Sequence, residues 1–140
     1  MADKVTVSWA ATPAEHDYPA AQAYLELLAP AAVAHGLVAL LAEAPTVHRD
    51  AKDILRAARL PLLPADNPAV RRDLRRIRKG TPLSPVLLVR GDLGAARNLQ
   101  VADGYHRVCA SYHVDENTPV ACRLVTAPPA PRGHLGTSDR

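Results

Sequence analysis

The stretch that is most informative about the fold is Val101-Ala102-Asp103-Gly104-Tyr105-His106-Arg107-Val108-Cys109-Ala110. This stretch follows an apolar run and a turn-rich break, and it precedes a short helical pattern that ends near His113. It predicts a strand that leads into a glycine turn and then into the start of a helix. Such a helix start presents free backbone N–H groups and the positive end of the helix dipole, which together attract an anion, typically a phosphate. Because Asp103, His106 and Arg107 surround this point, the segment predicts a phosphate site.

Three apolar segments near this stretch are predicted to be strands. Residues 85–89 form a continuous apolar run that is typical of a buried strand, and residues 98–102 return after a turn-rich loop. Residues 120–125 alternate well enough for a third strand. The predicted helix over residues 105–113 lies between the second and third of these strands.

The segment before the first strand carries the clearest helix signature of the chain. Asn67 is a candidate N-cap, Pro68 fits the first helical position and Gly80 fits the C-terminal stop. Apolar residues recur inside this helix at helical spacing and predict a buried stripe of Val70, Leu74 and Ile77. The rest of the helix, over residues 68–79, is strongly basic.

Further helices are predicted in the first half of the chain. Residues 17–28 and 31–43 form a pair, with Asp17 as an N-cap for the first helix. The apolar face of the second helix consists of Val33, Leu37, Leu40 and Leu41. A third helix is predicted over residues 48–59, and residues 5–9 are a candidate short strand.

The fold class is α/β (α+β), with the N-terminal helical pair packed on a small mixed sheet. A length of 140 residues suggests one domain with a sizeable core. We expect residues 1–48 to form a helical extension packed on the core, and residues 49–125 to form the core domain. The Pro- and Gly-rich residues 126–140 are expected to be a disordered tail.

The net charge of +3 is unevenly distributed. Residues 1–48 hold five acidic residues and one lysine, whereas residues 49–79 hold ten basic residues and four aspartates. This asymmetry has two interpretations: a solvated helix face, or a surface that binds nucleic acid weakly. The second interpretation would use the arginines of helix 68–79, namely Arg71, Arg72, Arg75 and Arg76. The acidic helical pair could instead bind a protein partner or a second copy in a homo-oligomer.

Several features point to the cytoplasm. No apolar stretch is long enough to span a bilayer, no signal peptide is evident, and we therefore predict no membrane association. The two cysteines, Cys109 and Cys122, lie in predicted regular elements and lack metal-ligand spacing.

Residues 52–125 resemble the ParB/sulfiredoxin superfamily. The resemblance rests on the order helix, Gly80, strand 85–89, hairpin, second strand and the motif Asp103-Gly-Tyr-His-Arg107. It implies that Gly104 and Arg107 hold the phosphates of a nucleotide. Sulfiredoxins carry a nucleophilic cysteine directly before the His-Arg pair, where this chain has Tyr105, and so we do not expect sulfinic acid reduction. The strongest resemblance is to uncharacterised actinobacterial-type ParB-like proteins that share Asp-Gly-Tyr-His-Arg-Val.

The resemblance extends to small-molecule kinases of the superfamily, whose motif is similar to Asp-Gly-His-x-Arg. In those enzymes an acidic residue after a Leu-x-Pro connector assists the substrate hydroxyl, and Asp66 is the nearby candidate. Kinase-like phosphoryl transfer would therefore use Asp66 and Asp103 as catalytic acids. The sequence does not decide whether the protein is an enzyme.

The predicted ligand is a nucleotide (ATP, ADP or CTP, with Mg²⁺) or a phosphorylated small molecule. Its phosphates would be bound by Gly104, Tyr105, His106 and Arg107, with the last as a bidentate clamp. Asp103 would bind the metal ion or accept a hydroxyl proton. The alternative is purely structural: Asp103 caps the helix, Gly104 supplies a positive φ, and Arg107 pairs with Asp103 or Asp92.

Overall fold

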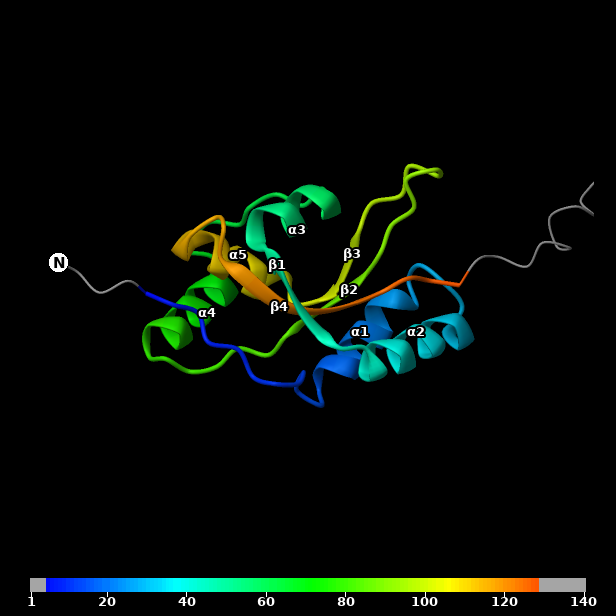
Figure 1. Cartoon of the computed structure of the whole chain (residues 1–140), viewed down its shortest axis with the longest axis horizontal. Helices are drawn as coiled ribbons and strands as arrows, with labels where there is room; N and C mark the ends of the chain where they lie inside the picture. The colour runs from blue at the N-terminus through cyan, green and yellow to red at the C-terminus, as the bar shows by residue number, and fades with distance from the viewer. Residues whose placement is uncertain (1–4, 129–140) are drawn as a thin grey trace, which may run out of the picture.

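A four-stranded mixed sheet lies at the centre of the molecule, in a computed structural model that describes residues 5–128. The strands are β1 (Thr46–Asp50), β2 (Val86–Val89), β3 (Gln100–Asp103) and β4 (Pro119–Val125). They are arranged in the order β1-β4-β2-β3 (Figure 1). β4 is antiparallel to β1 and parallel to β2, while β2 is antiparallel to β3. The predicted α+β class with a small mixed sheet is confirmed.

Helices cover both faces of this sheet. They are α1 (Asp17–Leu25), α2 (Ala31–Glu43), α3 (Ala51–Ala58), α4 (Pro68–Arg78) and α5 (Tyr105–Val114). One buried cluster joins the sheet to α3, α4 and α5, and a second joins its other face to α1 and α2 (Figure 1). Val86 and Leu88 belong to the first cluster, and Leu87 and Val89 to the second. Every side chain of β2 is therefore buried, which explains its unbroken apolar sequence.

The helices begin and end largely where the capping signals predict. The Asn67 side chain accepts hydrogen bonds from the amides of Ala69 (3.0 Å) and Val70 (3.2 Å), as expected of an N-cap. Gly80 follows α4 with a φ of +76°, which suits a glycine. The predicted stripe of Val70, Leu74 and Ile77 is buried.

Two predictions from the first half of the chain are wrong. Residues 48–50 do not begin a helix, because they belong to β1, which pairs with β4 from Thr46 to Asp50. The predicted domain boundary after residue 48 thus falls inside a strand of the central sheet. The segment 5–9 forms no strand, since only Trp9 makes a single bridge, to Leu83.

The predicted apolar face of α2 is only half correct. Leu37 and Leu41 are buried, but the third buried residue of the helix is Ala34. Val33 and Leu40 are 46% and 45% exposed, respectively. Ala34 belongs to the buried cluster that joins α1 and α2 to the sheet, so the buried face is rotated from the one that residue size predicts.

The predicted tail is described only in part. Residues 126–128 belong to no helix or strand, and residues 129–140 lie outside the described residues. Between residues 5 and 128, no helix has both the length and the apolar composition needed to cross a membrane.

Candidate functional site

The predicted junction of strand, glycine and helix is present. β3 ends at Asp103, and α5 begins at Tyr105 with Gly104 as its N-cap residue. Gly104 has a φ of +112°, and a Cβ atom placed on it would lie 2.4 Å from Cγ1 of Val86. The position therefore requires glycine for both backbone conformation and packing. No side chain caps the first turn of α5, so its first amide groups receive no side-chain acceptor.

Arg107 lies beside this junction, but its guanidinium is already bound to other groups of the protein. Nη2 donates to Oδ2 of Asp103 at 2.6 Å. Nη1 donates to the Ser84 carbonyl oxygen at 2.7 Å and to Oδ2 of Asp17 at 3.3 Å. The side chain is 12% exposed. Arg107 thus takes the structural role considered in the alternative interpretation, with Asp103 as its partner rather than Asp92. Asp103 does not cap α5.

Asp17 is a residue of this site that the sequence did not identify. It was predicted to be an N-cap, but it is the first residue of α1 and its side chain is 6% exposed. Its carboxylate accepts hydrogen bonds from the Ser84 hydroxyl, from the Ala14 amide (3.2 Å) and from Arg107. Because 90 residues separate Asp17 from Arg107, no local pattern could reveal this contact.

The two carboxylates around Arg107 have opposite pKa shifts. Burial raises the pKa of Asp17, but the hydrogen bond from Ser84 and the charge of Arg107 outweigh burial and hold it below its ordinary value. Burial, together with the neighbouring Asp17 charge, raises the pKa of Asp103 to about 6 despite the Arg107 guanidinium. Two carboxylates that share one guanidinium therefore have different affinities for a proton.

The junction opens into a cleft with a volume of about 760 Å³. This volume lies within the range of roughly 300–1,000 Å³ that is typical of small-molecule sites. Four segments form its walls: the chain leading into α1, α4, the loop before β2, and the β3–α5 junction. The polar residues that line it are His16, Asp17, Arg72, Asp73, Arg76, Thr81, Ser84, Asp103, His106 and Arg107.

α4 contributes two arginines to this cleft. Arg72 and Arg76 lie one helical turn apart and both line the cavity, whereas Arg71 and Arg75 do not. Arg76 is 53% exposed and lies 3.3 Å from Oδ1 of Asp73. Arg72 forms no ion pair within residues 5–128. The basic helix and the predicted phosphate site, which the sequence presented as separate features, thus meet in one cavity.

The other predicted site residues are divided between the cleft and its surroundings. His106 lines the cleft and is exposed. Tyr105 does not line it, because its hydroxyl donates to the Pro61 carbonyl on the connector between α3 and α4. Asp66 is exposed in the turn before α4 and is not part of the cleft.

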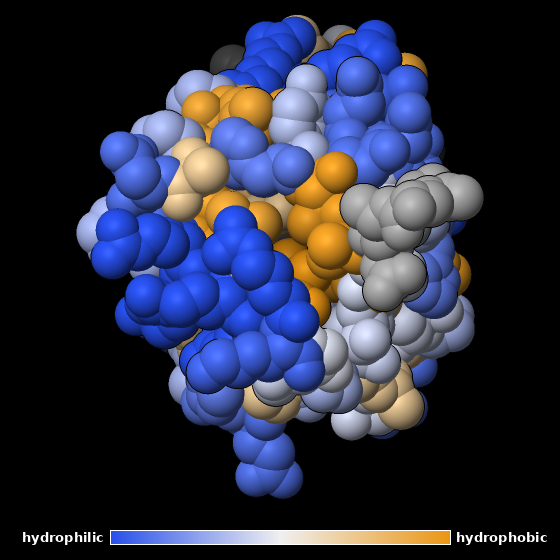
Figure 2. All heavy atoms as spheres, turned by 90° about the vertical axis from the view of Figure 1, so that its left-hand side faces the viewer, coloured by the Kyte–Doolittle hydropathy of each residue, from blue (hydrophilic) through white to orange (hydrophobic). Residues whose placement is uncertain are grey.

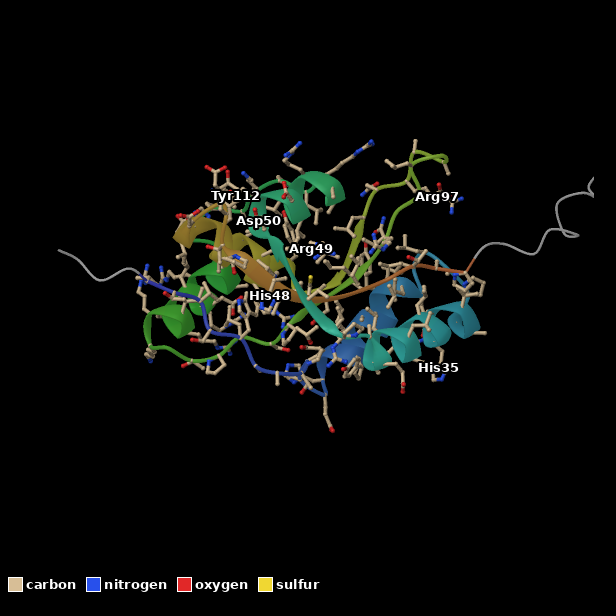
Figure 3. All side chains as sticks on the ribbon, viewed as in Figure 1. His35, His48, Arg49, Asp50, Arg97 and Tyr112 are labelled. Carbon is tan, nitrogen blue, oxygen red and sulfur yellow. The ribbon has the colours of Figure 1, made fainter. Side chains whose placement is uncertain are left out.

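The residues around Asp103 do not fit a directly bound Mg²⁺. The Oδ2 atom of Asp103 accepts from Arg107, and Asp17 is bound by the same guanidinium. A cation between these carboxylates would be repelled by Arg107. The described residues contain no group of three or more His, Cys, Asp or Glu side chains placed to hold a metal ion. Among the histidines, His35 on α2 and His48 on β1 lie well apart (Figure 3).

A second, smaller cavity of about 310 Å³ lies on the opposite side of α4. Its lining combines four apolar residues with three polar ones, namely Val5, Leu74, Ile77 and Val114 with Arg78, His113 and Asp115. Figure 2 shows this end of the molecule, where hydrophobic side chains form a hollow between hydrophilic ones. None of the predicted site residues contributes to it.

Comparisons of the chain with protein-family models, with curated proteins and with solved structures gave no match. The resemblance to the ParB/sulfiredoxin superfamily therefore stays a prediction from the residues.

Proposed function

We propose that the protein binds a nucleotide or a phosphorylated small molecule in the cleft at the start of α5. The observation that carries this proposal is the presence of Arg72 and Arg76 in the same cavity as an uncapped helix N-terminus. Backbone amides at a helix start and planar guanidinium groups are both suited to phosphate oxygens. His106 adds a ring nitrogen to the same cavity.

The assignment of phosphate ligands differs from the one that the resemblance implies. Arg72 and Arg76 are the proposed phosphate ligands, and Arg107 is a positioning residue that joins Asp17, Ser84 and Asp103. The proposal concerns binding, and no transfer step is assigned to Asp103, because its Oδ2 atom accepts from Arg107. Mg²⁺ enters only as the ion that accompanies a nucleotide in solution.

The cytoplasm is the proposed location of this binding. Nucleotides and sugar phosphates are produced there, and Cys109 and Cys122 are both free and buried. Free thiols are typical of reducing compartments.

Isothermal titration calorimetry with ATP, ADP and CTP, with and without Mg²⁺, tests the proposal. α4 supplies matched variants, because Arg72→Ala and Arg76→Ala remove cleft residues while Arg71→Ala and Arg75→Ala remove neighbours outside the cleft. We expect each cleft variant to weaken binding about tenfold or more, because each removes charge-assisted hydrogen bonds. The two control variants should change the affinity less than about threefold.

The same four variants distinguish the proposal from the nucleic-acid surface. A surface that contacts a phosphate backbone through α4 would lose affinity for oligonucleotides in all four variants, with a strong salt dependence. Absence of heat with every nucleotide at millimolar concentration would contradict the proposal.

A further inference from the structure

Asp73 is a buried carboxylate in the wall of the cleft. Its side chain is 8% exposed, and its Oδ1 atom lies 3.3 Å from Nη1 of Arg76. Within residues 5–128, no other group donates a hydrogen bond to this carboxylate, and its Oδ2 atom has no donor. An ionised carboxylate has about four acceptor sites, so most of the hydrogen-bonding capacity of Asp73 is unused.

The pair of Asp73 and Arg76 does not itself require a buried carboxylate. α3 carries the same arrangement at the same spacing, with Oδ1 of Asp53 3.4 Å from Nη1 of Arg56. In that pair the aspartate side chain is 56% exposed. Burial of a carboxylate with few donors is unfavourable, and accordingly burial raises the pKa of Asp73 in spite of the surrounding arginines. Such a group in a cleft is a candidate for ligand recognition.

The charges around Asp73 restrict which hydrogen-bond donors of a ligand can approach its carboxylate. Arg72 and Arg76 lie on the same helix, and Arg107 acts on Asp73 from α5. Ligand ammonium groups would be repelled by these cations, whereas a neutral hydroxyl group is compatible with them. The same cations attract a phosphate. A small molecule that carries a hydroxyl group and a phosphate can therefore donate a hydrogen bond to Asp73 and bind the arginines at the same time.

We propose that the cleft binds a phosphorylated polyol, such as a sugar phosphate or the ribose phosphate of a nucleotide, and that Asp73 accepts a hydrogen bond from one of its hydroxyl groups. This inference rests on the proposed function, because it requires that a phosphate binds beside Arg72 and Arg76.

Ribose 5-phosphate and methyl phosphate test the inference, because both are phosphate monoesters and only the first carries hydroxyl groups. Calorimetry at pH 8 favours the ionised form of Asp73, whose pKa is raised by burial. We expect ribose 5-phosphate to bind wild-type protein about tenfold more tightly than methyl phosphate, as expected for a hydrogen bond to a charged acceptor. Asp73→Asn and Asp73→Ala should reduce this ratio to about threefold or less.

The affinity for methyl phosphate separates recognition from a structural role. If Asp73 recognises the hydroxyl group, then neither variant weakens methyl phosphate binding, because each removes a negative charge beside the phosphate. Asp53→Asn, which alters the matched pair outside the cleft, should leave both affinities unchanged.

Three results of these titrations would contradict the inference, and one of them would also contradict the proposed function. Equal affinity of wild-type protein for the two esters overturns the inference and leaves the proposed function intact. A preference for ribose 5-phosphate that persists in a folded Asp73 variant, as judged by circular dichroism, also overturns it. Failure of both esters and of all nucleotides to bind overturns the proposed function as well.

Discussion

Gly104 joins β3 to α5 at a point where backbone conformation and packing impose the same residue. Its φ of +112° is disfavoured for any residue with a Cβ atom, and Val86 occupies the space that the Cβ atom would need. The glycine therefore determines where the uncapped helix start lies relative to the sheet. A side chain at this position would displace the first turn of α5 and, with it, Arg107.

Substitution of Gly104 by alanine should destabilise the protein by about 2–4 kcal/mol, since the strain of a left-handed residue adds to overpacking against Val86. Gly36 is a matched control, because it lies within α2 with no atom within 4 Å of a Cβ placed on it. Gly36→Ala should stabilise the protein by about 0.5–1 kcal/mol. Urea unfolding of the two variants measures both effects. Equal effects of the same sign would contradict this account of Gly104.

The sequence allowed only part of the site to be predicted at the level of residues. Asp103, Gly104 and Arg107 are close in sequence, so their proximity follows from local geometry. Asp17 and Asp73 come from other elements, and their burial depends on how α1 and α4 pack around Arg107. No sequence pattern encodes that packing, and for this reason neither of the two interpretations of Arg107 included Asp17.

At the level of elements, the last turn of α2 is stabilised by a residue from the sheet. Arg123 of β4 is 8% exposed, and its Nη1 atom donates to the carbonyl oxygens of Leu41 (3.3 Å) and Ala42 (2.8 Å). These carbonyl groups lie in the last turn of α2, which has no basic residue of its own. The guanidinium thus satisfies free acceptors and the negative end of the helix dipole together.

Replacement of Arg123 by methionine should destabilise the protein by about 2–3 kcal/mol, because buried carbonyl groups lose a charged donor while the aliphatic packing is retained. Arg97 provides the comparison, since it lies in the exposed loop between β2 and β3 (Figure 3). Arg97→Met should change the free energy of unfolding by less than about 0.5 kcal/mol. Thermal and urea unfolding test both variants. Similar stabilities for the two would show that the contact with α2 is unimportant.

The elements themselves were predictable where the sequence carries caps, prolines or a buried apolar run, as at Asn67 and in β2. β1 was missed for a physical reason. It is an edge strand, and its His48 and Arg49 side chains are exposed, so it lacks the apolar character of the inner strands (Figure 3). The following residues, 51–58, carry a helical pattern, and the prediction extended that helix backwards into the strand.

At the scale of the whole molecule, the Arg107 network joins three distant parts of the chain. Asp17 comes from the N-terminal helical pair, Ser84 from the loop before β2 and Asp103 from β3. The helical pair is therefore bound to the cleft as well as to the sheet. The pH dependence of unfolding reports on this network because its two carboxylates titrate differently.

Deprotonation of Asp103 should lower the free energy of unfolding as the pH rises from about 4 to 7. Its pKa in the folded protein is about 6, above the ordinary 3.8, so the folded state binds more protons in this range. The resulting stabilisation is complete below pH 4 and is lost as the pH rises through 6. Asp17 behaves in the opposite way, because its pKa is lowered and its contribution is lost only below about pH 4.

Comparison with Asp103→Asn isolates this effect, because the amide does not titrate. Between pH 4.5 and pH 7 the variant should gain about 1–3 kcal/mol relative to wild-type protein, measured by urea unfolding at each pH. Parallel pH profiles for the two proteins would contradict the raised pKa of Asp103.

The position of β4 has a consequence for how the chain folds as it is synthesised. Among the described residues β4 is the last strand in the chain, yet it lies between β1 and β2 and is the only strand paired with β1 there. Until residues 119–125 emerge, the nascent chain can form only the β2–β3 hairpin, and the edge residues of β1 have no partner. Assembly of the four-stranded sheet therefore waits for residues 119–125, and a nascent chain that lacks them has not yet joined β1 to β2 and β3.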